Sequence, residues 1–349
     1  MEKKVPKTIL FLGETYRADA QTWIRGIESS SGISIDTLEV KGTSTRAGRI
    51  LKFLGFGFQI LKTNFSKSYD LVLAERATSY GLFSLFVNAK KRIVAQQGIT
   101  DAWPEEGFSG VYKRFFQKLV YKKVDLIHAW GEVMVPAMIN SGADPHKIMV
   151  LPKGINLESY AFGKEKNPNL AIVTRSLTPV YHHDLILEAV SILKLENIDL
   201  QLKIVGDGPL LIILKERTKE LGLENQVEFL GRIHNTQLPK FLQNSGLYIS
   251  FPETEGVSAS LFEAMATGCF PVVSDLPGTR AFINSGENGI LVPAKDSQAL
   301  AQAIKFYIRN PNLVSQAVLN NRKFVEDHAD VKKNMEEIWK RYCSVFQEN

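Results

Sequence analysis

The sequence predicts an α/β protein made of two domains, each a doubly wound parallel sheet with helices on both faces. The chain has 349 residues, which is enough for two hydrophobic cores of ordinary size. Short apolar runs alternate with longer amphipathic stretches along nearly the whole chain, a pattern typical of βα units. A polar stretch at 163–169 interrupts this alternation, and we expect the domain boundary there.

The first series of apolar runs predicts the sheet of an N-terminal domain. A short apolar run between polar segments is typical of a buried strand, and a longer amphipathic stretch is typical of a helix. The expected strands cover 8–12, 33–40, 71–74, 92–96, 126–129 and 148–151. The expected helices cover 20–29, 49–62, 79–88, 112–121 and 133–140.

The second series predicts a similar C-terminal domain. Its expected strands cover 170–174, 200–205, 227–230, 247–250, 270–274 and 290–292. Its expected helices cover 184–194, 209–221, 237–244, 258–267 and 297–308, and the tail reads as one helix over 314–346. We therefore expect domains at 1–157 and 165–325, followed by a terminal segment at 326–349. Paired domains of this kind bind ligands between them, at the carboxyl ends of the strands.

The composition is that of an ordinary globular protein. Hydrophobic residues make up 44% and charged residues 23% of the chain, which excludes wholesale disorder. Cys269 and Cys343 cannot make a disulfide framework, so a reducing cytoplasm is the expected compartment. No run approaches the ~18 apolar residues of a membrane-spanning helix, and the first residues lack the apolar core of a secretory signal. The sequence thus predicts a cytoplasmic protein.

The net charge of +5 is unevenly distributed. Residues 1–166 carry 24 basic and 16 acidic side chains, a net charge of +8, and the remainder is acidic. Two basic stretches also contain aromatic or aliphatic residues, which suits either an anionic membrane surface or a solvated basic face over a core. No nucleic-acid-binding motif is present. The basic side chains are Arg46, Arg49, Lys52 and Lys62 in the first stretch and Lys113, Arg114, Lys118, Lys122 and Lys123 in the second.

The segment from Pro252 to Gly268 is the most informative for function. A strand ends near Phe251, a turn follows, and a helix begins near Ser258. The free N–H groups at a helix start suit a phosphate, and the carboxylates of Glu255 and Glu263 suit sugar hydroxyls. The alternative from these residues alone is a capped helix with two solvated glutamates.

Several spaced motifs together resemble the retaining glycosyltransferases of family 4 (glycosyl transferases group 1), which have the GT-B fold. Glu255 and Glu263 are separated by seven residues and followed by Ala-Met-Ala-Thr-Gly, as in the family signature. The other matching segments are 151–156, 205–210, 227–231, 271–275 and 288–293. The resemblance implies that the terminal helix crosses back to the first domain.

The resemblance also implies roles for the matching residues. Glu263 should bind the ribose of a nucleotide-diphosphate sugar, and Glu255 the hydroxyls of the donor sugar. The base and the diphosphate should be held largely by main-chain groups. The matching positions are Gly206, Leu230, Arg232 and Ile233 near the strand ends, and Gly256, Val257 and Ser258 at the helix start.

Arg175 follows an expected strand and is predicted to stabilise the charge that develops on the departing diphosphate. The family usually has a Lys-Gly pair a few residues later, where this chain has Tyr181 and His182. Either of these side chains hydrogen-bonds the diphosphate, or Arg280 supplies the missing cation. A further alternative is that His182 and its neighbour His183 are simply the exposed flank of a helix.

The first domain contributes weaker signals. A family histidine near the donor sugar is replaced by Gln97, which hydrogen-bonds but does not titrate, and Asp101 matches a family aspartate. Gly13 ends the first expected strand and would let backbone approach a ligand, and Arg17 follows it. The resemblance implies that the acceptor binds in this domain.

Other chemistries lack their sequence patterns. The histidines and cysteines show no metal-ligand spacing, and Walker, nucleophile-elbow and dinucleotide-binding motifs are absent. The resemblance implies a retaining, metal-independent glycosyltransferase of cell-surface polysaccharide or glycolipid synthesis, with no cofactor besides its nucleotide-sugar donor. Its acceptor is expected to be a glycan or lipid-linked, and the protein to be peripheral on the inner face of the membrane. The alternatives are a non-catalytic nucleotide-sugar-binding subunit and a GT-B nucleotide-sugar epimerase.

Overall fold

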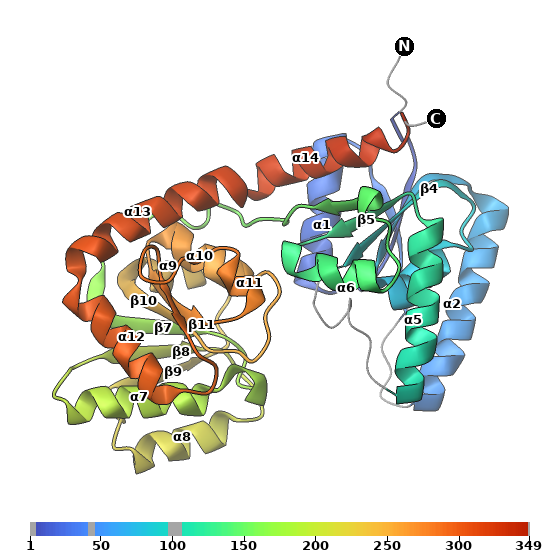
Figure 1. Ribbon diagram of the computed structural model, residues 1–349. Coiled ribbons are helices and arrows are strands. Elements are labelled where there is room, and N and C mark those ends of the chain that lie inside the picture. The colour runs from blue at the N-terminus through green and yellow to red at the C-terminus, as the bar shows by residue number, and fades with distance from the viewer. Residues whose placement is uncertain (1–4, 41–45, 97–106, 348–349) are drawn as a thin grey trace. The chain divides into compact units, whose positions relative to one another are not determined.

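The computed structural model describes residues 5–40, 46–96 and 107–347 (Figure 1). The chain divides into two compact units, one comprising residues 1–153 and 331–349 and the other residues 154–330. Each unit contains a six-stranded parallel sheet with its own buried core, so the predicted α/β class is confirmed. Within the described residues no helix is long and apolar enough to span a membrane.

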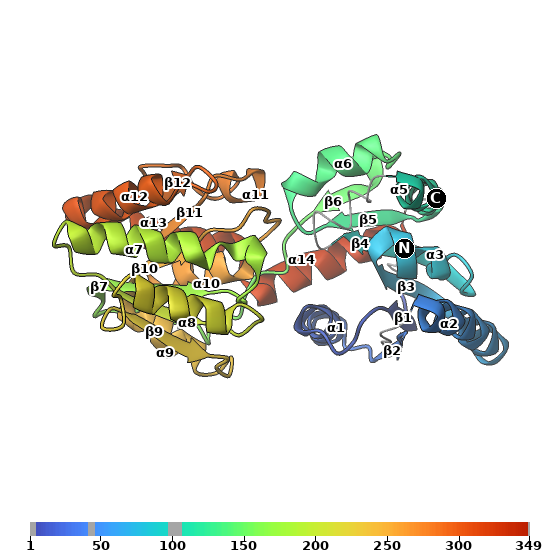
Figure 2. The same ribbon diagram turned by 90° about the horizontal axis from the view of Figure 1, so that it is seen from below.

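The first unit is built on a sheet with strand order β2-β1-β3-β4-β5-β6. α1 packs against α14, and α3 lies between α2 and α5 (Figure 2). The strands are β1 (Ile9–Leu12), β2 (Ile35–Leu38), β3 (Tyr69–Glu75), β4 (Ala89–Gln96), β5 (Leu126–Ala129) and β6 (Ile148–Val150). The α-helices are α1 (Ala18–Ser31), α2 (Arg46–Ser66), α3 (Gly81–Ser84), α5 (Gly107–Lys123), α6 (Val135–Asn140) and α14 (Val331–Ser344).

A buried histidine joins α14 to this sheet. His128 on β5 lies 2.6 Å from the hydroxyl of Tyr342 through Nδ1 and 2.8 Å from the carbonyl oxygen of Leu151 through Nε2. Burial lowers the pKa of His128 to about 3, so the ring is neutral at physiological pH. A neutral ring donates from one nitrogen and accepts at the other, which satisfies both contacts.

The second unit has the strand order β12-β11-β10-β7-β8-β9, with β7 at the point where the order reverses. α7 packs with α8 and α12, and α10 packs with α9 and α13 (Figure 1). The strands are β7 (Asn167–Thr174), β8 (Gln201–Val205), β9 (Val227–Gly231), β10 (Ser245–Ser250), β11 (Phe270–Ser274) and β12 (Ile290–Val292). The helices are α7 (His183–Leu195), α8 (Leu211–Glu220), α9 (Leu238–Asn244), α10 (Ala259–Thr267), α11 (Pro277–Arg280), α12 (Ser297–Arg309) and α13 (Pro311–His328).

Two of the expected helices differ from the structure. The expected tail helix over 314–346 is broken, because the carbonyl of Ala329 accepts a hydrogen bond from Ile155 N at 2.8 Å and Asp330 forms a β-bridge with Ile155. The expected helix over 79–88 ends at Ser84. There the side chain of Asn64 bonds the carbonyl of Phe86 and the amide of Asn88, which turns the chain into β4.

Candidate active site

The carboxyl ends of the central strands in the second unit bring three loops together. β7, β8 and β10 run parallel and end at Thr174, Val205 and Ser250, so the loops that follow them lie at one edge of the sheet. The loop after β8 packs directly on the loop after β7. A Cβ on Gly206 would lie 2.1 Å from the carbonyl oxygen of Arg175, and the φ of +151° is itself unfavourable for other residues. Gly206 therefore permits this close approach.

Arg175 donates hydrogen bonds to three side chains at this edge. Its Nε donates to Ser250 Oγ at 3.1 Å, and its Nη2 donates to both Glu255 and Ser258 Oγ. The side chain is only 12% exposed. Burial alone would lower the pKa of Arg175, but the neighbouring Tyr248 and Glu255 raise it overall, so the guanidinium is permanently charged.

The turn after β10 leads into α10 with its helix start well formed. Ser258 is the N-cap, and its Oγ accepts a hydrogen bond from Leu261 N at 3.3 Å. Gly256 and Val257 precede it in the turn and are half-buried. The start of α11 closes on this turn, because a Cβ on Gly278 would lie 2.2 Å from the carbonyl oxygen of Gly256. The positive end of α10 thus lies beside Arg175, an arrangement suited to an anion.

Glu263 lies on α10 and contacts a residue that the sequence analysis missed. Burial raises the pKa of Glu263, while a hydrogen bond from Tyr160 and the charge of Arg175 act in the opposite direction. Tyr160 is buried, and its contact with Glu263 contributes to raising the pKa of the phenol. Tyr160 carried no signal in the sequence because it lies in the segment before β7, outside any strand or helix.

Tyr181 and His182 form the turn that precedes α7. The Tyr181 ring centre lies 5.3 Å from the guanidinium carbon of Arg175, a cation–π contact. His182 adopts the left-handed conformation, with φ 44°, at the position where the similar family has glycine. Its Nε2 lies 3.2 Å from Glu253 Oε1, and Glu253 also pairs with Lys295.

The alternative that both histidines form an exposed flank is wrong. His183 is 1% exposed, because the turn is tied down by a hydrogen bond from Glu253 N to the carbonyl of Val180 at 2.9 Å. Burial lowers the pKa of His183 to about 4.

The remaining candidates of this unit lie around the same edge. Arg280 on α11 is exposed and forms a two-pronged ion pair with Asp275, at 2.5 and 2.9 Å. At the end of β9, Leu230 and Ile233 are half-buried against the core, and Arg232 is exposed. The main chain here joins the loop after β8, because Gly206 N donates to the carbonyl of Gly231 at 2.9 Å.

The candidates of the first unit are less completely described. Gly13 follows β1, and a Cβ there would lie 2.7 Å from Glu75 Oε2, which accepts a hydrogen bond from Glu14 N. Arg17 pairs with Glu14 at 3.1 Å. Gln97 and Asp101 lie outside the described residues. Within the described ranges, no three His, Cys, Asp or Glu side chains are grouped closely enough to hold a metal ion.

Most of the second unit matches a known protein family in sequence. Residues 156–324 match the family described as glycosyl transferases group 1. A Campylobacter jejuni protein named N-acetylgalactosamine-N,N'-diacetylbacillosaminyl-diphospho-undecaprenol 4-alpha-N-acetylgalactosaminyltransferase is 27% identical over 76% of this chain and 74% of its own length. A Mycobacterium leprae phosphatidyl-myo-inositol mannosyltransferase is 29% identical over 58% of this chain and 54% of its own length.

Solved structures extend the similarity of fold to nearly the whole chain. Anabaena HepE, crystallised with UDP and glucose, superposes with a TM-score of 0.78 at 18% identity and covers 97% of this chain and 100% of its own. A sucrose-phosphate synthase from Thermosynechococcus elongatus gives a TM-score of 0.81 at 14% identity, covering 98% of this chain and 99% of its own.

Proposed function

Because residues 156–324 match the family described as glycosyl transferases group 1 and the chain has the GT-B fold, we propose that it moves a sugar from a nucleotide diphosphate to an acceptor hydroxyl with retention of configuration and without a metal ion. The observation that carries this proposal is the junction of Arg175, Glu255 and Ser258 at the carboxyl end of β7. A permanent cation, a sugar-binding carboxylate and a helix start meet there.

The residues of this junction have distinct roles in the proposed reaction. The bond between the anomeric carbon and the diphosphate oxygen breaks, and the carbon bonds to the acceptor oxygen. The acceptor proton passes to the departing phosphate oxygen, so no protein base is needed. Arg175 and the amides of 256–258 stabilise the negative charge that develops on the diphosphate, which removes the need for a metal ion. Glu255 binds the hydroxyls of the donor sugar.

The remaining candidates complete the proposed donor and acceptor sites. Glu263 binds the ribose, and the main chain at 230–233 frames the base. The second candidate function, a nucleotide-sugar-binding subunit without turnover, is favoured by one observation, the replacement of the family's Lys-Gly by Tyr181 and His182. The donor-binding role of Gly13 and the catalytic roles of Gln97 and Asp101 stay predictions.

Thermal unfolding with nucleotide sugars tests the donor site. A ligand at about 100 times its Kd stabilises the native state by about 2.7 kcal/mol, so one of the UDP, GDP or ADP sugars should raise Tm by roughly 5–10 °C. The matched control is the free nucleoside, which lacks the diphosphate that Arg175 binds. If none of these donors raises Tm, the proposed donor site is refuted. Stabilisation without turnover on any acceptor would support the binding subunit instead.

An apolar and basic surface of the first unit supports a membrane-bound acceptor. Large apolar side chains are exposed on α2, on α5 and after α3, with Phe65 93% and Phe58 72% exposed. Exposed basic side chains, such as Lys62 and Arg114, accompany them. This combination is typical of surfaces that lie on anionic bilayers. The other exposed apolar residues here are Phe53, Leu54, Leu61, Phe86, Val111, Tyr112 and Phe115.

We infer that this surface holds the protein on the inner face of the cell membrane, beside a lipid-linked acceptor. In a vesicle co-sedimentation assay, the protein should bind phosphatidylglycerol vesicles and be released by salt. Replacing Phe58 and Phe65 by glutamate should lower the partition coefficient between vesicles and water by at least tenfold, because two rings that would be buried in lipid are removed. Ile212→Glu on α8, an exposed apolar residue of the other unit, is the control. Equal binding by the double variant would exclude this surface.

A further inference from the structure

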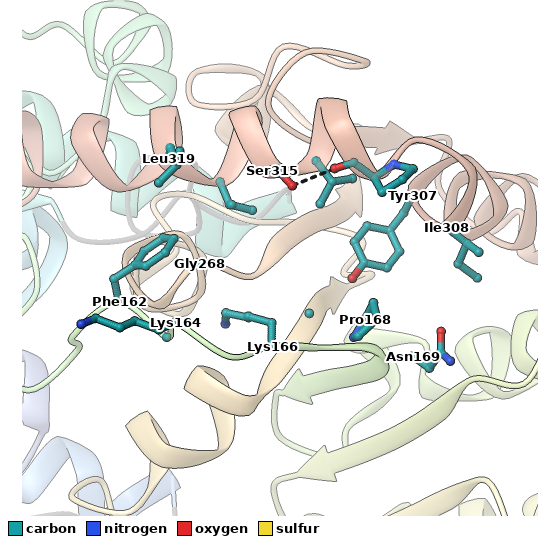
Figure 3. A pocket seen from close by; sticks show the side chains of 15 residues that line it. Phe162, Lys164, Lys166, Pro168, Asn169, Gly268, Tyr307, Ile308, Ser315 and Leu319 are labelled. Carbon is teal, nitrogen blue, oxygen red and sulfur yellow. Dashed lines mark hydrogen bonds between the residues drawn. The ribbon is translucent and has the colours of Figure 1, made fainter.

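A cavity of about 620 Å³ lies in the second unit at the amino ends of the strands, opposite the edge that carries Arg175 (Figure 3). It is bounded by the segment 162–169 that leads into β7, by Gly246 at the start of β10, by the end of α12 and by α13. β7 and β10 begin beside the cavity and end beside Arg175. The cavity is therefore separate from the proposed donor site.

The cavity is elongated, and much of its wall is apolar. Val314, Val318 and Leu319 line it along α13, and Phe162 faces them from the segment before β7 (Figure 3). Lining residues run from Pro311 to Leu319, which at 1.5 Å per residue is about 12 Å of helix. Leu319 is 54% exposed, so one end of the groove is open. This shape suits a narrow, extended apolar molecule.

One tyrosine hydroxyl faces the cavity. The Tyr307 side chain lines the cavity and is 4% exposed, and no hydrogen bond joins its hydroxyl to a residue that the structure describes. In Figure 3 the phenol oxygen points toward the segment that carries Lys166 and Pro168. Burial raises the pKa of Tyr307, so the hydroxyl keeps its proton and offers it as a donor. A ligand oxygen in the cavity can accept a hydrogen bond from this hydroxyl.

The charged residues that line the cavity indicate which charge a ligand should carry. Lys164 and Lys166 line it, no acidic residue is among its described lining, and neither lysine forms an ion pair with a described residue. The ammonium of Lys166 is held at 2.7 Å from the carbonyl oxygen of Leu242 and 2.8 Å from that of Ser245. Cys269 Sγ is a third acceptor, at 3.4 Å, and burial lowers the pKa of Lys166, so the exposed Lys164 is the stronger positive charge at the cavity. An anionic head group with acceptor oxygens is therefore favoured over a cationic one.

We propose that this cavity binds a medium-chain alkyl carboxylate. The carboxylate accepts from Tyr307 and lies in the field of the two lysines, and the alkyl chain lies along α13 against Phe162, Val318 and Leu319. The ligand occupies the opposite end of β7 and β10 from the nucleotide sugar, so the two do not compete. This proposal does not depend on the identity of the donor.

Calorimetric titration with octanoate, below its micelle concentration, tests the proposal. Octanoate should bind with one site per chain, octan-1-ol about tenfold more weakly, and octylamine not measurably, because only the carboxylate accepts charge-assisted hydrogen bonds. Octanoate should leave the affinity for UDP unchanged. Equal binding of the three compounds, absence of octanoate binding, or competition with UDP would each overturn the proposal.

Variants locate the bound octanoate. Val318→Trp fills the groove and should abolish binding, and Ile212→Trp, at an exposed position on α8, should not alter it. Tyr307→Phe removes only the hydroxyl and should weaken binding about fivefold. If Val318→Trp lowers Tm or alters the circular dichroism spectrum, Lys164→Glu at the exposed rim replaces it, with the same expected loss. Binding unaffected by Tyr307→Phe and by the groove or rim variant would refute this location.

Discussion

Replacing Arg175 by alanine is expected to lower kcat/KM for sugar transfer by about 10²–10³-fold, the typical effect of removing a group that stabilises charge in the transition state. The reason is geometric: one guanidinium, 12% exposed, contacts Ser250, Glu255 and Ser258 at the point where the diphosphate is proposed to leave. Its loss also leaves the Glu255 carboxylate without its partner. Steady-state kinetics at saturating acceptor measure the effect.

One further variant separates charge from geometry at this position, and a second variant elsewhere in the unit is the control. Arg175→Lys keeps the positive charge but loses the planar fork, so only partial activity is expected. Arg217→Ala removes another ion-paired arginine of the second unit. Arg217 pairs with Glu188 on α7 and with Glu220 on α8, and its loss should leave turnover unchanged. Full activity of Arg175→Ala, with an unchanged Tm, would remove Arg175 from the mechanism.

Replacing Glu263 by glutamine is expected to raise the donor KM about 10–100-fold with a smaller effect on kcat. Hydrogen bonds to a charged group contribute about 1.5–3 kcal/mol, and the proposed contact with the ribose would be the same in the ground and transition states. Calorimetric titration with the nucleoside diphosphate measures the same loss without turnover. Glu216→Gln, at an exposed position on α8, is the matched control.

The pH dependence of donor binding adds a second readout for Glu263. Burial raises the pKa of this carboxyl, and only its ionised form accepts hydrogen bonds from both ribose hydroxyls. Nucleotide affinity should therefore fall as the pH decreases through that raised pKa, and Glu263→Gln should flatten this part of the profile. An unchanged affinity in Glu263→Gln would place the ribose elsewhere.

The strands of both sheets were predictable because buried parallel strands are nearly continuous apolar runs. The stretches at 170–174 and 270–274 contain almost only apolar residues, and each has a neighbouring strand on both sides in the second sheet. The break between α13 and α14 was not predictable from periodicity. Helical residues flank it on both sides, and the break follows from pairing with Ile155, which is distant in the sequence.

The donor-site candidates were found by the spacing of Glu255 and Glu263, since a turn and a helix start carry recognisable residues. The role of Ser250 as a partner of Arg175 had no such signal, because a serine at a strand end is common. Tyr160 and Glu253 were missed for a related reason. Their contacts with Glu263 and His182 are made across the fold and leave no local pattern.

The sequence alone determined the α/β class, the order of the strands along the chain and the residue types proposed for the donor site. These properties depend on local spacing, which a linear chain records directly. Tertiary structure decided that Arg175 meets Glu255 and Ser258, that His182 takes a left-handed conformation against Glu253, and that Tyr307 faces a cavity. Parallel strands bring residues from remote segments to one sheet edge, and such contacts depend on packing rather than on neighbours in the chain.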